Sequence, residues 1–236
     1  MGKLFRFEFR KLFRTKAFYV CTIIATLPIS LFAILTKFGN GLLYVQAALT
    51  TTSMFPVFLG IYMANFVCMD QANDTLKNVY AKGYDRNKIY AAKYIVSLVG
   101  AIIMTAVCLL MAYLSGKMFE TVTITPSNDY VLTVLVQFLG VVAYHALYFI
   151  VSNSIGRTGG AVAINIAGPS FVTLLLNIID TTIASKGINF TVSPYWISST
   201  LTVNSDTLLR SFIVALVYIV VFLVIGFFLN RRKETK

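Results

Sequence analysis

The only histidine in the sequence is the first candidate for acid–base or metal chemistry. His145 lies in VVAYHALYF, inside an apolar run that holds no second histidine and no carboxylate. Metal centres and proton relays need several such groups within reach of one another. We therefore expect no catalytic residue and no metal site. A polar residue inside a membrane span is a functional candidate by default. Two interpretations of His145 stay open, a hydrogen bond between helices and a lining position in a transport pathway.

Carboxylates are absent from the middle of every apolar run. Asp70, Asp129, Asp180 and Asp206 fall at the ends of these runs or in the polar connections. Carriers driven by protons or sodium usually keep an ionisable group or a broken-helix ion site near the middle of the membrane. The pattern argues against an ion-coupled carrier without excluding it, because Gly168-Pro169 is expected to break the fifth apolar run.

A phosphate-binding loop is also missing. GRTGG at 156–160 lacks the Gly-Lys-Ser/Thr ending of such a loop, and Gly116-Lys117 is followed by Met118. We expect no enzyme activity and no cofactor in this chain. If ATP drives the protein, ATP and Mg²⁺ bind to another subunit.

The composition predicts an all-α integral membrane protein with a single transmembrane domain over residues 1–236. Hydrophobic residues make up 58% of the 236 positions and charged residues only 12%, whereas soluble domains have about a quarter charged residues. A membrane-spanning helix needs about 20 apolar residues. Six runs of this kind are present, at 17–36, 49–69, 94–114, 130–153, 161–179 and 211–229.

Basic residues are concentrated in alternate connections between these six spans. Sixteen of the 20 Lys and Arg residues fall in the N-terminus, 70–93, 153–160 and the C-terminus, and four fall on the other side. Cytoplasmic loops carry the excess of basic residues. Both termini are therefore expected in the cytoplasm, with the protein in a bacterial cell membrane. The net charge of +11 suits anionic lipid headgroups, and no nucleic acid partner is expected.

Residues 1–16 predict an amphipathic helix in the membrane interface. At 100° per residue, Phe5, Phe9, Leu12 and Phe13 share one face, and the opposite face carries Arg6, Arg10 and Arg14. Leu4 and Phe7 fall outside the apolar stripe. The alternative is a merely basic flank to the first span.

Residues 70–93 predict a short transverse helix followed by a long one. Asp74 suits the start of the first helix, and Gly83 suits its end. Leu76, Val79 and Tyr80 give that helix one apolar face. Asp85 caps the next helix, whose roughly 45 Å length up to Leu114 exceeds the roughly 30 Å hydrocarbon core. The third span should thus project into the cytoplasm. The alternative is a solvated loop packed on its own chain.

The same segment resembles the loop between spans two and three of ABC permeases of the type-2 exporter class. The likeness rests on Asp70 and on a run of later positions: Thr75, Leu76, Lys77, Lys82, Gly83, Arg86, Ile89, Tyr90 and Lys93. The basic N-terminus is similar to the elbow helix of that family. The loop with Ser193-Pro194-Tyr195-Trp196 looks like its external re-entrant helices. The resemblance implies that this loop forms a coupling helix, near Asp74–Lys82, that docks on a separate ATPase, and the expected contact residues of the loop are Leu76, Lys77, Val79, Tyr80, Lys82, Gly83 and Arg86.

The resemblance also implies the function. Small bacterial permeases of this class include phenol-soluble modulin exporters and immunity permeases for lantibiotics and bacitracin, so the expected cargo is an amphipathic peptide or similar hydrophobic toxin. The expected partners are an ABC ATPase subunit, a second permease copy as a homodimer or related heterodimer, and the lipid bilayer. A non-transporting immunity or scaffold protein is the alternative. Because polar groups avoid lipid, four residues are candidates for the substrate cavity: Asn65, His145, Asn165 and Asn177.

The charge bias generates a topology prediction. Cysteine introduced by Ser185→Cys is expected to react with an impermeant thiol reagent added outside the cell, and cysteine introduced by Lys82→Cys is not. Labelling in intact cells, compared with lysed cells as a control, measures both. The reverse pattern contradicts a six-span protein with cytoplasmic termini.

Overall fold

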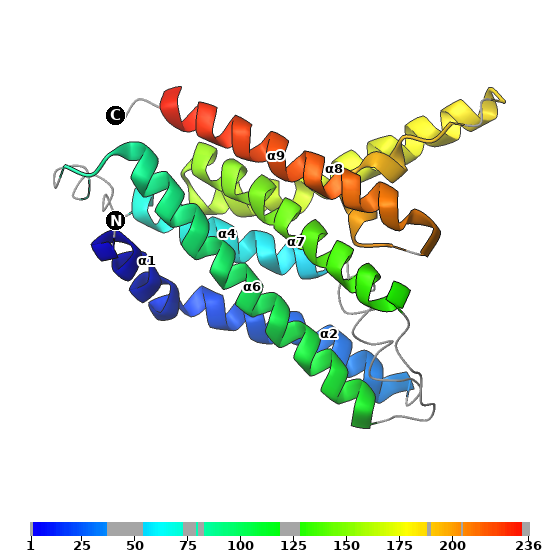
Figure 1. The fold of residues 1–236 in the computed structure, drawn as a ribbon, viewed down its shortest axis with the longest axis horizontal. Coiled ribbons are helices and arrows are strands. Elements are labelled where there is room, and N and C mark those ends of the chain that lie inside the picture. Colours follow the sequence, from blue (N-terminus) through cyan, green and yellow to red (C-terminus); the bar gives the residue numbers. More distant parts are fainter. Residues whose placement is uncertain are drawn as a thin grey trace.

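The computed structural model describes residues 2–36, 54–72, 79, 83–118, 128–187, 190–203 and 205–232, and these residues form helices and short connections without a strand. The helices lie side by side as one bundle (Figure 1). The α-helices are α1 (Gly2–Arg14), α2 (Lys16–Thr36), α4 (Met54–Ala72), α6 (Arg86–Met118), α7 (Asn128–Ile155), α8 (Thr158–Ser185) and α9 (Leu208–Arg232). Three 3₁₀ helices lie between the last two: η1 (Ser193–Tyr195), η2 (Ile197–Thr200) and η3 (Ser205–Thr207).

Each of the six expected spans coincides with a helix. Within the described residues, four helices are long and apolar enough to cross a membrane: Arg86–Met118, Tyr130–Ile155, Thr158–Ser185 and Leu208–Arg231. Helices α2 and α4 have 21 and 19 residues. The expected start of the second span, residues 49–53, lies outside the described residues. The complete six-span count therefore stays a prediction.

Helix α6 has the predicted start and the predicted excess length. The Asp85 carboxylate accepts a hydrogen bond from the Asn87 backbone N–H at 3.3 Å, and the Asp85 carbonyl accepts from Lys88 and Ile89. Its 33 residues correspond to about 50 Å, well beyond the roughly 30 Å hydrocarbon core.

The expected break in the fifth span is wrong. Helix α8 runs without interruption from Thr158 to Ser185 with Pro169 inside it. Proline removes one backbone donor, which frees the carbonyl of Asn165 four positions earlier, and helices in apolar surroundings tolerate such a loss. The hydroxyls of Ser170 and Thr173 donate to the carbonyls of Ile166 and Pro169 at 3.2 and 2.8 Å.

The segment between α8 and α9 folds back onto the bundle. It forms three single-turn 3₁₀ helices where the resemblance implied re-entrant helices, and Ile197, Thr200 and Leu201 are buried. The Asp180 carboxylate accepts the backbone N–H groups of Val192 and Ser193 at 2.6 and 3.0 Å, which ties η1 to α8. The side of the membrane on which this segment lies stays a prediction.

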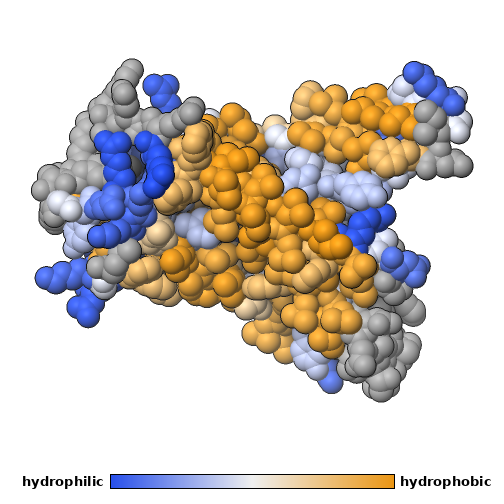
Figure 2. All heavy atoms as spheres, turned by 45° about the horizontal axis from the view of Figure 1, so that its top comes forward, coloured by the Kyte–Doolittle hydropathy of each residue, from blue (hydrophilic) through white to orange (hydrophobic). Residues whose placement is uncertain are grey.

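The surface separates by polarity along the molecule. Figure 2 shows an apolar band across the middle, with hydrophilic residues gathered towards the ends. Helix α1 and the C-terminal end of α9 lie at the same end of the bundle (Figure 1). This placement agrees with an even number of crossings.

Close packing of η2 on α7 generates a stability prediction. A Cβ at Gly140 would contact the Thr200 hydroxyl and lie 3.1 Å from its carbonyl oxygen, whereas a Cβ at Gly159 has no neighbour within 4 Å. Gly140→Ala is expected to lower the stability by about 1–3 kcal/mol through overpacking. The control Gly159→Ala is expected to leave it unchanged or slightly higher. Thermal unfolding in detergent measures both, and equal midpoints would contradict the packing seen here.

Candidate functional site

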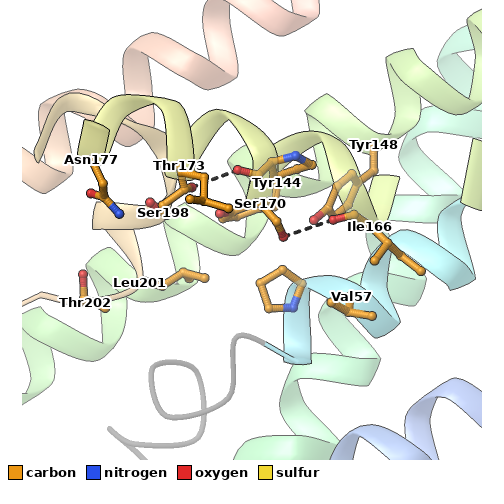
Figure 3. A pocket seen from close by; sticks show the side chains of 13 residues that line it. Val57, Tyr144, Tyr148, Ile166, Ser170, Thr173, Asn177, Ser198, Leu201 and Thr202 are labelled. Atoms are coloured by element: carbon orange, nitrogen blue, oxygen red, sulfur yellow. Dashed lines mark hydrogen bonds between the residues drawn. The ribbon is translucent and has the colours of Figure 1, made fainter. Parts of the chain in front are cut away.

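A cavity of about 320 Å³ lies between α4, α7, α8 and the η2 segment. Figure 3 shows Tyr144 and Tyr148 of α7 in one row with Ser170, Thr173 and Asn177 of α8, and it shows Leu201, Thr202 and Val57 across from them. Seven lining side chains carry a hydroxyl or amide: Tyr144, Tyr148, Ser170, Thr173, Asn177, Ser198 and Thr202. The remaining six are apolar or proline: Pro56, Val57, Ile166, Pro169, Leu174 and Leu201.

The lining of this cavity is amphipathic and uncharged. Ligand sites typically combine an apolar wall with a few placed polar groups. Hydroxyl and amide groups both donate and accept hydrogen bonds. The cavity therefore suits a ligand that presents apolar groups beside neutral hydrogen-bonding groups, such as a peptide backbone.

The four predicted cavity residues lie in different surroundings. Asn177 lines the large cavity, and Asn165 lines a smaller one of about 180 Å³ between α7 and α8. Neither cavity includes Asn65 or His145. The Asn65 amide donates to the Ile61 carbonyl of its own helix at 2.8 Å.

Two of these residues hold helices together. The fully buried His145 Nε2 lies 2.9 Å from the Ser97 hydroxyl of α6, the arrangement of the first interpretation given above. The Asn165 amide donates to the Gly60 carbonyl at 3.0 Å and to the Ser152 hydroxyl at 3.1 Å, joining α8 to α4 and α7. Buried hydrogen bonds of this kind stabilise helix association in membranes.

Sequence reasoning missed the tyrosines and hydroxyls of the large cavity. Tyr144 and Tyr148 are spaced i, i+4 and therefore share one face of α7. Ser170, Thr173 and Asn177 have the spacing i, i+3, i+7, which places them on one face of α8. This polar stripe on an otherwise apolar helix was the available signal.

A group of buried charged residues lies where α1, α4 and α6 meet. Lys11 Nζ of α1 and Lys93 Nζ of α6 each lie 2.6 Å from Asp70 Oδ2 of α4. Glu8 of α1 is 3.7 Å from Lys11 Nζ. Burial raises the pKa of the Glu8 carboxyl and lowers the pKa of the Lys11 ammonium. We call Glu8, Lys11, Asp70 and Lys93 the charge cluster.

Helix α1 packs on the bundle through a face that shares only part of the apolar stripe expected to meet the membrane. Leu4, Glu8 and Leu12 are buried, Phe5 and Phe9 are half-buried, and Phe13 is 50% exposed. The expected polar side is confirmed as exposed at Arg6, Arg10 and Arg14. Leu4 is buried because it packs against Ile89 and Ala92 of α6. Glu8 is buried because it pairs with Lys11 in the charge cluster. Whether α1 lies in the membrane interface stays a prediction.

Most of the predicted coupling residues cannot be placed. Leu76, Lys77, Tyr80 and Lys82 lie outside the described residues. Val79 is half-buried and packs against the Leu4, Ile89 and Ala92 cluster of its own chain. Gly83 has a φ of 77°, the left-handed region that suits a helix end, and Arg86 is exposed at the start of α6.

Apolar helices of membrane-spanning length, packed as one bundle around an uncharged cavity, define a multi-pass membrane protein. The sequence model of the ABC-2 family transporter proteins matches residues 4–165, more than half of the chain, so this chain belongs to that family. The family supplies the membrane component of a transporter and not its ATPase. No curated protein matches the chain.

Proposed function

We propose that this chain is the permease subunit of an ATP-driven exporter that moves amphipathic peptides out of a bacterial cell. The family match over 4–165 carries the proposal, since it covers the N-terminal helix, the segment 70–93 and the first four spans. The uncharged cavity beside α8 supports the cargo class, because its tyrosines, hydroxyls and one amide suit peptide groups and its aliphatic wall suits apolar side chains.

A separate ATPase is the proposed source of energy and the holder of ATP and Mg²⁺. In this proposal its docking site is the segment that joins α4 to α6, at the end of the bundle that carries the charge cluster. Tyr80 and Leu76 are the proposed apolar anchors, and Lys77, Lys82 and Arg86 are the proposed rim charges. Val79 is a less suitable anchor than the sequence suggested, because part of its surface is used against Leu4 and Ile89.

A second permease copy is the proposed partner within the membrane. Only Ala161 and Asn165 of the 28 residues of α8 are buried. Its apolar surface is open along most of its length, with Phe171 62% and Leu174 61% exposed. The half of α8 after Pro169 extends beyond the rest of the bundle (Figure 1). Pairing of this half with its counterpart would enclose the large cavity between two copies.

Purification in mild detergent tests the partner. The wild-type chain is expected to retain an ATPase that carries both nucleotide-binding motifs. Tyr80→Ala is expected to release it, since loss of an interface anchor often costs more than about 1–2 kcal/mol. Lys77→Ala should be milder and more sensitive to salt. Recovery of the folded wild-type chain without an ATPase would favour the immunity or scaffold alternative.

Peptide-stimulated ATP hydrolysis by the purified complex tests the cavity. Asn177→Leu is expected to change the peptide concentration that gives half-maximal stimulation, because this variant removes a polar lining group. Thr181→Leu, one turn further along the exposed side of α8, is the matched control. Asn165→Leu should instead lower the unfolding midpoint, since two buried hydrogen bonds are lost. An unchanged response in Asn177→Leu removes this residue from the cargo site.

A further inference from the structure

The last turn of α4 is bonded to three other helices. Lys93 Nζ of α6 donates to the Val67 carbonyl at 3.4 Å, and the Cys68 thiol donates to the Ser152 carbonyl of α7 at 3.3 Å. The Gln71 amide donates to the Asn153 carbonyl of α7 at 3.3 Å. Asp70, between these residues, binds both α1 and α6 through the charge cluster.

The charge cluster is buried and balanced. Its four side chains are each at most 10% exposed, and it contains two carboxylates and two ammonium groups. Lys11 Nζ also lies 4.4 Å from the centre of the Phe66 ring. A buried charge is tolerated only when it is paired, and removal of one partner is strongly destabilising. The three helices are therefore held together by groups that none of them can bury alone.

We infer that the charge cluster joins α1 to α4 and α6 so that the three helices move as one body during transport, with Asp70 as the positioning residue at the joint. Helices α4 and α6 are the spans on either side of the proposed ATPase-docking segment, so the role in transport rests on the proposed function. Lys11 and Glu8 act from α1, outside the spans, and Lys93 acts from the extended end of α6. The joint transmits a displacement of either flanking helix to the N-terminal helix without any group touching the cargo.

A double-mutant cycle on the permease alone tests the pairing. Asp70→Asn leaves two buried lysines beside one carboxylate and is expected to lower the unfolding midpoint by on the order of 10 °C. Asp70→Asn with Lys11→Met restores the balance and should recover at least half of that loss. Additive effects of the two substitutions would overturn the coupling between these charges.

Spin labels on two exposed positions test the rigid body. Lys3→Cys on α1 and Lys88→Cys on α6 carry the labels, both residues being exposed. The background carries Cys21→Ala, Cys68→Ser and Cys108→Ala, in which the serine keeps a hydrogen-bond donor. The distance distribution is expected to be narrow in this background.

Removing the α1 charges as a pair should broaden the distribution between the labels. Glu8→Gln with Lys11→Met leaves the Asp70–Lys93 pair intact, so the protein stays balanced and folded. The exposed Arg10→Met is the matched control on α1 and should change nothing. A distribution in the double variant identical to that of the background would overturn the joint.

Peptide-stimulated ATP hydrolysis by the complete complex of permease and ATPase tests the role of the joint in transport. Glu8→Gln with Lys11→Met is expected to retain the ATPase but to lose peptide stimulation by about 5-fold or more, the range of an ordinary coupling free energy. If the wild-type complex exports peptide and the Glu8→Gln with Lys11→Met variant exports it equally well, the inferred joint is overturned and the proposed function stands. A wild-type chain that binds no ATPase would overturn the proposed function, and the melting and spin-label measurements would still decide the joint.

Discussion

Neutralisation of buried charge is the constraint that organises the end of the bundle near α1. Two lysines from different helices converge on one oxygen of Asp70, and a buried charge is tolerated only when it is paired. Leu4 and Leu12 of α1 are buried on the same side of the helix as Lys11. Ile89 and Ala92 of α6 are buried near Lys93 and pack with Leu4. The hydrophobic contacts of α1 therefore depend on an electrostatic contact that fixes which face of the helix points inward.

The opposite part of the protein is held by a different kind of contact. Helix α8 contributes two buried residues, and one of them, Asn165, is bonded to α4 and α7. Beyond Pro169 its side chains contact the cavity and the surface, and Asp180 fixes the 3₁₀ segment to it. The end near α1 thus relies on paired charges, and the part around α8 relies on hydrogen bonds, both from the Asn165 amide and to the Asp180 carboxylate. The walls of the large cavity beside α8 carry no charged side chain.

The sequence predicts where the helices lie along the chain better than it predicts which helix faces pack together. Apolar runs locate the helices, and Asp85 and the length to Leu114 correctly indicate a third helix longer than the bilayer. The faces of α1 were less predictable, because Lys11, the ion-pair partner of Glu8, binds Asp70, which is 59 positions away on α4. Pro169 misled because an apolar helix can continue through a proline with the loss of one backbone hydrogen bond. The hydroxyl stripe of the cavity was visible in the spacing of Ser170, Thr173 and Asn177, but the tyrosines beside it become neighbours only through packing.

Helix α6 extends to different lengths on the two sides of Gly100. At Gly100, a side chain as small as a methyl group would clash with the Tyr62 ring and hydroxyl of α4. Gly100 is 14 positions from Arg86 and 18 positions from Met118, so the two parts of the helix measure about 21 and 27 Å. A tilt of the α1, α4 and α6 body about an axis level with Gly100 would move the two ends of α6 in opposite directions, and the end at Met118 would travel about 1.3 times as far as the end at Arg86. A side chain larger than hydrogen at Gly100 would press on Tyr62 and separate α6 from α4, and the two ends of α6 would then no longer move together with α4.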